Sequence, residues 1–168
     1  MTTSLAMTVI GPDRPGLVRI LSDAVASHGG NWLESRMARL AGQFAGVVRV
    51  ECAASSADAL VSALETLGSE GLVVQVIREE APPAEVRRTI TVDVVGNDRP
   101  GIVRDFAAAI ANAGGNVEEL TTGLESAPMA GHPLFRAHGI ISIPENSDSA
   151  DLIAAIENLG SDLSVDIV

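Results

Sequence analysis

The sequence of 168 residues predicts an α+β protein made of two copies of one βαββαβ unit. The segment 11–19 (GPDRPGLVR) returns as 96–104 (GNDRPGIVR), an offset of 85 residues between Gly11 and Gly96 that is close to half of the chain. Each copy of the segment stands between a stretch with strand periodicity and a stretch with helix periodicity. Two antiparallel sheets, each with its helices on one face, fit this order, which is the ferredoxin-like arrangement.

The first strand and the first helix of each unit are predicted from two different periods. Apolar and polar residues alternate over 89–94, which predicts a strand with one buried face. After each repeated segment, apolar residues recur three and four positions apart, which predicts a helix. These residues are Leu17, Ile20, Leu21, Ala24 and Val25 in the first unit and Ile102, Phe106, Ala109 and Ile110 in the second. Pro15 and Pro100 stand where a first-turn proline is tolerated, and the glycine pairs 29–30 and 114–115 stand where a helix ends.

A hairpin, a second helix and a closing strand complete each unit. Residues 32–41 and 44–52 predict the first hairpin, with a tight turn at Gly42, and residues 126–133 form an insertion in the second hairpin. The helix that opens at 55–58 (SSAD) has apolar residues on one face, as has its repeat. They are Leu60, Leu64 and Leu67, and Leu152, Ile156 and Leu159. Strands over 72–77 and 163–168 close the units, and we expect the second and fourth strands at the sheet edges and right-handed crossovers.

We expect two domains, residues 1–80 and 88–168, joined by a linker over 81–87. The paired prolines and the charges of this segment favour a short, stiff connection. A unit of about 80 residues has a marginal core, and its edge strands are templates for pairing. We therefore expect a pseudo-symmetric pair within the chain and a homodimer.

The charge balance excludes several classes of function. The chain has 22 acidic and 11 basic side chains, a net charge of −11, and every basic residue is Arg. Phosphate neutralisation needs clustered cationic side chains, so we expect neither direct nucleic-acid binding nor attachment to an anionic membrane. Without Lys the chain has no Walker-type phosphate loop, no pyridoxal Schiff base and no catalytic lysine.

Cysteine, histidine and the first residues of the chain indicate the compartment and exclude a metal site. Cys52 is the single cysteine, so no intrachain disulfide forms. The sequence starts without the features of a secretory signal and has no apolar run of about 20 residues, so we expect a cytoplasmic protein. The histidines at 28, 132 and 138 have no metal-ligand spacing with each other or with Cys52, and we expect no metal and no cofactor.

The repeated Gly-x-Asp-Arg-Pro-Gly-(Leu/Ile)-Val, followed by Gly-Gly-Asn at 29–31 and 114–116, resembles the ACT domain in two copies over nearly the whole chain. Residues 31–40 and 126–135 also resemble segments of tandem-ACT proteins of the glycine cleavage system transcriptional repressor family. The resemblance implies a regulatory protein that is not an enzyme. Such a protein binds a small molecule, most often an amino acid, and the bound state of its site controls an attached enzyme or a protein partner. Since the two modules use the whole sequence, we expect the output to be contact with a transcription factor or a metabolic enzyme. The resemblance implies glycine or serine as the ligand.

An amino-acid ligand needs partners for a carboxylate and for an ammonium group. Backbone N–H groups at the start of the first helix offer a seat for the carboxylate beside the positive end of the helix dipole, and an aspartate just before the helix can accept from the ammonium. The resemblance implies that this aspartate and the asparagine after the first helix contact ligand, as Asp13 with Asn31 and as Asp98 with Asn116. The expected ligand-binding residues are Gly11, Asp13, Gly16, Leu17 and Asn31 in the first unit and Asn97, Asp98, Gly101, Ile102 and Asn116 in the second.

The same residues also have structural interpretations. The two aspartates can cap the first helices, the arginines that follow them can be solvated or paired with acids, and the two asparagines can be turn residues. A second function also remains open. Acylphosphatase shares this strand order and works with an Arg and an Asn, so the alternative is a small acylphosphatase-like hydrolase, although no phosphate loop of that type is present.

Overall fold

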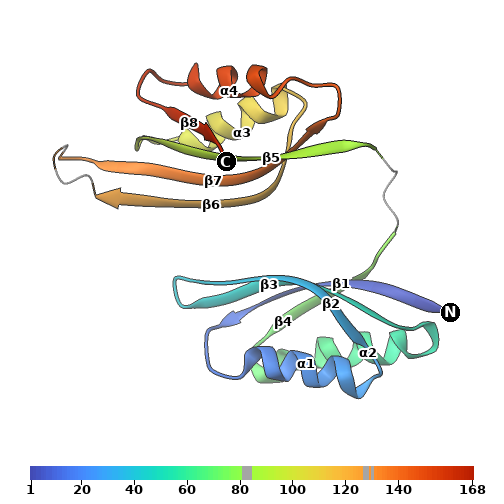
Figure 1. Cartoon of the computed structure of the whole chain (residues 1–168). Helices are drawn as coiled ribbons and strands as arrows, with labels where there is room; N and C mark the ends of the chain where they lie inside the picture. The colour runs from blue at the N-terminus through green and yellow to red at the C-terminus, as the bar shows by residue number, and fades with distance from the viewer. Residues whose placement is uncertain (81–84, 127–128, 130) are drawn as a thin grey trace. The chain divides into compact units, whose positions relative to one another are not determined.

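The computed structural model describes residues 1–80, 85–126, 129 and 131–168. The chain divides into two compact units, Met1–Pro82 and Pro83–Val168. Each unit is a four-stranded antiparallel sheet with its helices on one face (Figure 1), as the sequence predicts. The linker prediction over 81–87 falls partly outside the described residues, and the first strand of the second unit already begins at Arg87.

The first unit contains four strands and two α-helices. They are β1 (Thr2–Pro12), α1 (Leu17–Ser27), β2 (Asn31–Leu40), β3 (Gln43–Ala53), α2 (Ala57–Glu65) and β4 (Val73–Arg78), with short 3-10 segments at Ala54–Ser56 and Thr66–Glu70. The sheet order is β2-β3-β1-β4. The prediction that the second and fourth strands form the edges is therefore confirmed.

The second unit repeats this topology. Its elements are β5 (Arg87–Asn97), α3 (Ile102–Asn112), β6 (Asn116–Ser126), β7 (Pro133–Pro144), α4 (Ser149–Glu157) and β8 (Ser164–Ile167). The sheet order is β6-β7-β5-β8, again with the second and fourth strands at the edges. No helix in the described part of the chain has the length and the apolar character that crossing a membrane requires.

Each unit has its own core between sheet and helices. In the first unit, alternate residues of β1 and residues four apart on α1 are buried, which is the pairing of strand and helix periods that the sequence predicts. The corresponding helix residues of the second unit, Ile102, Phe106 and Ile110, are each at most 5% exposed. Full burial of one such side chain stabilises the fold by about 1.5–3 kcal/mol, so each of these periodic residues contributes to the apolar driving force.

The first helix of each unit begins at a glycine and not at an aspartate cap. The N-cap residues are Gly16 and Gly101, with left-handed φ values of 91° and 84° and no side-chain cap hydrogen bond. Asp13 and Asp98 therefore do not cap these helices, and the capping interpretation is wrong. The prolines just before the two glycines precede the helices and are not in their first turns. Glycine is required at the cap because a side chain is strained at this φ.

Both hairpins carry a bulge at the same place in their edge strand. The register of β2 against β3 shifts between Trp32 and Glu34, and that of β6 against β7 shifts between Val117 and Glu119. A bulge turns its extra residue in a new direction. The extra residues are Leu33 in the first unit and Glu118 in the second, so the same backbone device orients an apolar side chain in one copy and a carboxylate in the other.

Candidate functional site

A cavity of about 340 Å³ lies at the start of α3 in the second unit. Its walls come from the turn before α3, the first residues of α3, the edge strand β6 and the start of β7. The lining residues are Asp98, Arg99, Gly101, Ile102, Val103, Arg104, Thr122, Gly123, Leu124 and Phe135. Three of the residues predicted to bind ligand, namely Asp98, Gly101 and Ile102, thus line one cavity.

The aspartates of the two repeated turns have different surroundings. The Oδ2 atom of Asp13 lies 2.8 Å from Nε of Arg39 on β2, so this carboxylate is paired. The backbone N–H of Asp98 donates to the carbonyl of Pro133 at 3.2 Å, and the side chain of Asp98 has no ion-pair or hydrogen-bond partner among the described residues. The second unit therefore offers an open carboxylate where the first offers a neutralised one.

Two guanidinium groups are held at the rim of this cavity by one carboxylate. Nη1 of Arg99 lies 2.7 Å from Oδ2 of Asp105, and Nε of Arg104 donates to Oδ1 of Asp105 at 3.0 Å. The hydrogen bonds from Arg99 and Arg104 hold the pKa of Asp105 below its usual range. Arg104 folds over Gly101, because a Cβ built on that glycine would lie 3.1 Å from Nη2 of the arginine.

The backbone donors at the helix start are only partly open. The N–H of Ile102 donates to the carbonyl of Arg99 at 3.3 Å, so the expectation of a free N–H there is wrong. The N–H groups of Gly16, Leu17 and Gly101 find no acceptor among the described residues. The positive end of the dipole of α3, together with the two arginines, still favours an anion at this place.

Two of the predicted ligand residues have structural roles. A Cβ on Gly11 would lie 2.5 Å from the carbonyl oxygen of Gly71, so this glycine allows β1 to pack against the segment before β4. The backbone N–H of Asn97 donates to Oδ2 of Asp162 at 2.8 Å. Neither Gly11 nor Asn97 lines the cavity at α3.

Asn116 lies at the opposite end of its unit from Asp98. Strand β5 has 11 residues, about 36 Å at about 3.3 Å per residue, and its first residue, Arg87, donates to the carbonyl of Gly114 at 2.8 Å. Asn116 lines a separate cavity of about 420 Å³ beside Arg87. One amino acid cannot span that length, so Asp98 and Asn116 of the same unit do not contact one ligand. The sequence leaves open which copies form the site, and this geometry leaves only an arrangement in which the two contacts come from different copies or belong to different sites. The topology separates Asp13 and Asn31 in the same way.

A polar network lies beside Asn116 that the sequence alone did not predict. Nδ2 of Asn116 donates to Oε1 of Glu118 at 3.0 Å, and Oγ of Ser142 donates to the same oxygen at 2.6 Å. The signal that could have found it is the comparison of the two copies. Position 118 carries Glu where its repeat position carries Leu33.

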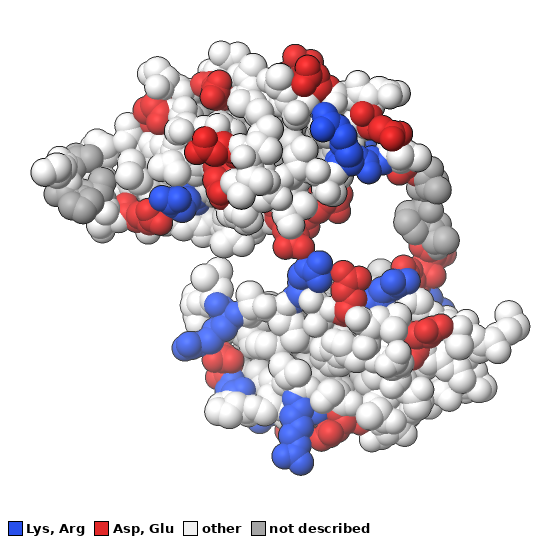
Figure 2. All heavy atoms as spheres, in the orientation of Figure 1, with Lys and Arg blue, Asp and Glu red and all other residues white. Residues whose placement is uncertain are grey.

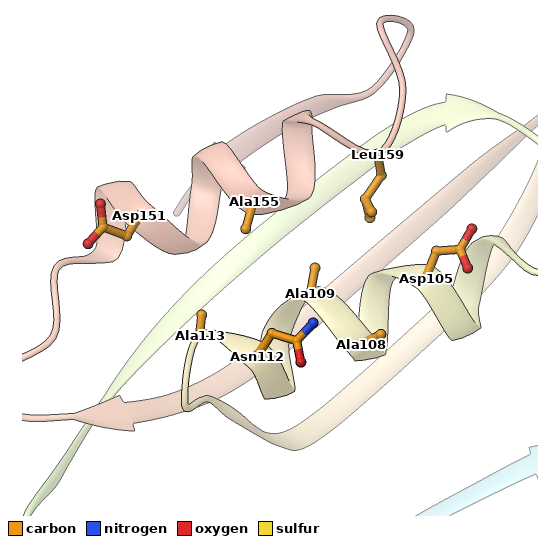
Figure 3. Close-up of a pocket in the computed structure, with 8 residues that line it drawn as sticks. All are labelled: Asp105, Ala108, Ala109, Asn112, Ala113, Asp151, Ala155 and Leu159. Carbon is orange, nitrogen blue, oxygen red and sulfur yellow. The ribbon is translucent and has the colours of Figure 1, made fainter.

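A further cavity, of about 530 Å³, lies between α3 and α4 (Figure 3). The lining residues are Asp105, Ala108, Ala109, Asn112, Ala113, Asp151, Ala155 and Leu159. In Figure 3, Ala109, Ala113, Ala155 and Leu159 point into the space between the two helices, whereas Asp105 and Asp151 stand near its opposite ends. None of the predicted ligand residues lines this groove, and its charged groups do not converge.

The charges on the visible surface are mixed in sign, and the described residues hold no cluster of metal ligands. In Figure 2 the arginines of the visible face are scattered among Asp and Glu side chains and do not gather in one patch. The described residues contain no group of three His, Cys, Asp or Glu side chains that could hold a metal ion. Cys52 is buried in the core, and burial raises the pKa of its thiol.

The arginines of the two repeated turns are each held in place by a group of their own unit. Nη2 of Arg14 donates to the carbonyl of Glu70 at 2.7 Å, and Arg99 is paired with Asp105. The asparagine that follows the first helix lies at the other end of each unit. The structure therefore does not bring this Arg and this Asn together, and the hydrolase reading has no support in the arrangement.

Comparisons with known proteins agree with the fold and the repeat. The ACT domain family model matches residues 3–76. The chain is 26% identical over 164 residues to the glycine cleavage system transcriptional repressor of Escherichia coli (strain K12), which covers 95% of this chain and 85% of that protein. A crystal structure of an unknown protein from Galdieria sulphuraria has a TM-score of 0.86 and 31% identity, covering 99% of this chain and 98% of its own.

A second crystal structure, of a candidate glycine cleavage system transcriptional repressor, shares the fold, with a TM-score of 0.72, 20% identity, and coverage of 100% of this chain and 98% of its own. The second unit of our chain repeats both the topology and the Asp-Arg-Pro-Gly turn of the first. The ACT-domain family model thus covers nearly all of the first unit, and the chain as a whole resembles the tandem-ACT glycine cleavage system transcriptional repressors.

Proposed function

We propose that this protein is a regulator that binds a small amino acid at the start of α3 and passes the occupancy to a protein partner. The observation that carries the proposal is the presence of opposite charges in one cavity. The carboxylate of Asp98 is open, and the guanidinium groups of Arg99 and Arg104 stand at the rim. An amino acid carries the complementary charges. Its ammonium group pairs with Asp98, and its carboxylate faces the arginines and the positive end of α3.

A second copy of the chain completes the site. The edge strand β6 begins at Asn116 and supplies three residues of the cavity, Thr122, Gly123 and Leu124, near its other end. Antiparallel pairing of two β6 strands about a two-fold axis brings the start of one strand beside the end of the other. Asn116 of the second copy then lies beside the cavity at α3.

The edge of β6 is suited to this pairing. Residues 118–126 are exposed in the single chain, and Leu120 and Leu124 are 38% and 61% exposed. A long, exposed edge strand with apolar side chains favours addition of another strand. The proposal of a homodimer therefore also accounts for why the two expected ligand contacts lie at opposite ends of one unit.

The output is contact with another protein, either a transcription factor or a metabolic enzyme in the cytoplasm. The net charge of −11 and the scattered arginines disfavour direct contact with DNA. Ligand binding changes partner affinity by the difference in binding free energy between the ligand-bound and ligand-free conformations. The relative from Escherichia coli is named for the glycine cleavage system, so glycine is the first ligand to test.

Calorimetric titration tests the proposal. Glycine, serine, threonine, methionine, tryptophan and the branched-chain amino acids are titrated into the wild type, Asp98→Ala and Asp13→Ala. We expect at least one of them to bind the wild type and Asp13→Ala, and to lose binding to Asp98→Ala. Absence of binding throughout would refute the proposal. Release of phosphate from acetyl phosphate by the purified protein would favour the hydrolase instead.

A further inference from the structure

Asn116 is held by a chain of hydrogen bonds that starts inside the second unit. Nη2 of Arg87 donates to the carbonyl oxygens of Gly114 and Ser142 at 2.8 Å and 3.0 Å, and its Nε donates to Oγ of Ser142 at 3.2 Å. Ser142 is 4% exposed, and its hydroxyl donates to Glu118. Glu118 in turn accepts from the amide of Asn116. Backbone carbonyls thus hold Arg87 in place. Arg87 in turn orients Ser142, and Ser142 orients Glu118, which binds the amide of Asn116.

The chemistry of Glu118 decides which end of the Asn116 amide is held. Hydrogen bonds from Ser142 and Asn116, together with the charge of Arg87, outweigh burial and hold the pKa of Glu118 below its usual range. The carboxylate is therefore ionised at neutral pH and can only accept hydrogen bonds. Asn116 has to turn its NH2 group toward Glu118, and its Oδ1 atom remains available as an acceptor.

We propose that Glu118 is a positioning residue for ligand recognition, which orients Asn116 so that its Oδ1 atom accepts from the ammonium group of an amino acid. This inference rests on the proposed function. It favours ligands that present a hydrogen-bond donor to this oxygen, such as the ammonium group of an amino acid, over carboxylates that have no donor.

The first unit lacks the residues of this hydrogen-bond network that orient the asparagine. Asn31 and Asn116 both begin an edge strand, but the bulge residue that follows is Leu33 in one unit and Glu118 in the other. The residue opposite the asparagine is Glu51 in the first unit and Ser142 in the second. Leu33 cannot accept a hydrogen bond. Recognition of the amine therefore belongs to the second unit.

The alternative role of the network is purely structural, because it ties the exit of α3 to β5, β6 and β7. A structural role predicts that loss of Glu118 lowers the free energy of unfolding and changes ligand affinity independently of Asn116. A positioning role predicts that the effect on affinity disappears once Asn116 is removed. The two roles are separated by a double-mutant cycle on ligand binding.

The experiment titrates glycine and serine into the wild type, Glu118→Leu, Asn116→Ala and the double variant, with Asn31→Ala as the matched control. Urea denaturation of each protein verifies that it is folded. We expect Glu118→Leu to weaken binding about tenfold, the size of one lost hydrogen bond to a charged group, and to weaken it no further in the Asn116→Ala background. Glu118→Gln keeps the size of the side chain but offers a donor as well as an acceptor, so it should also weaken binding. Asn31→Ala should bind as the wild type does.

Three results would overturn the inference. In the first, Glu118→Leu weakens binding by the same factor with and without Asn116. In the second, Asp98→Ala abolishes binding while Glu118→Leu and Glu118→Gln leave it unchanged. This result contradicts the inference but agrees with the proposed function. In the third, none of the amino acids binds the wild type, and the proposed function fails together with the inference.

Discussion

Arg39 and Leu124 occupy the same register position in the two units. Arg39 lies opposite Phe44 on β3, and Leu124 lies opposite Phe135 on β7. Nε of Arg39 lies 2.8 Å from Asp13, whereas Leu124 lines the cavity that contains Asp98. One difference between the copies therefore decides whether the carboxylate of the repeated turn is paired, and it makes the second unit the better candidate for an amino-acid site.

Leu124→Arg should transfer this pairing to the second unit. The introduced guanidinium group competes with the ligand ammonium for Asp98, so we expect the affinity for the amino acid to fall about tenfold, or about 1.4 kcal/mol. Calorimetric titration measures the change, and Arg39→Leu is the control that should leave the affinity unaltered. Undiminished binding by Leu124→Arg would contradict the role of Asp98 as the ammonium acceptor.

Equivalent glycines in β1 and β5 should respond differently to substitution. A Cβ on Gly11 would lie 2.5 Å from a backbone oxygen, that of Gly71, whereas a Cβ on Gly96 would lie 2.4 Å from the end of the flexible Leu163 side chain. We expect Gly11→Ala to lower the free energy of unfolding by about 2–3 kcal/mol and Gly96→Ala by about 1 kcal/mol, as measured by urea denaturation. Gly68→Ala, with no atom within 4 Å of the new Cβ, is the control and should change it by less than about 1 kcal/mol. Equal losses at positions 11 and 96 would contradict this account.

The fold could be predicted from the sequence because its signals are local and occur twice. The strand alternation before each repeated turn and the helix spacing after it lead to the observed order of elements, and the tight turn at Gly42 lies where the sequence places it. The start of α1 was not predicted correctly. An aspartate near a helix start is typical of a cap, but Asp13 is bound by Arg39, 26 positions further along the chain, and the cap is Gly16.

The candidate site was predicted only in part, because some of its residues are brought together by contacts between distant parts of the sequence, as Asp13 and Arg39 are. Asp98, Gly101 and Ile102 are close in sequence and line one cavity. The role of Asn116 depends on Ser142 and Arg87, whose positions relative to it follow from strand pairing and not from sequence spacing. The distance between Asp98 and Asn116 likewise becomes apparent only when β5 is seen to run the full length of the unit.

The stability of the second unit should depend on the charge of Asp162. The backbone N–H of Asn97 donates to its Oδ2 atom at 2.8 Å and holds the pKa of Asp162 below the ordinary value of 3.8. Because the pKa is lower in the folded state, the charged carboxylate stabilises the fold above the unfolded-state value, and this contribution is lost as the pH falls through the folded-state value. We expect the wild type to exceed Asp162→Asn in free energy of unfolding by a constant amount at neutral pH and by less below pH 3.8. Urea denaturation over a pH series measures the difference, and a difference that stays constant into the acid range would contradict the assignment.

The turn between β2 and β3 contains a strained residue. Ala41 has a φ of 50° and is followed by Gly42 with a φ of 76°, and Ala41 is the one residue other than glycine with positive φ in the described part of the chain. An alanine in this region costs about 1 kcal/mol, whereas Asn before Gly is the preferred sequence for a two-residue hairpin turn with both φ values positive. Ala41→Asn should therefore raise the free energy of unfolding by about 0.5–1 kcal/mol, and Ala41→Val should lower it because a β-branched residue is disfavoured at positive φ. Thermal unfolding of the two variants beside the wild type tests this, and a midpoint for Ala41→Asn at or below that of the wild type would show that the turn adapts to alanine without strain.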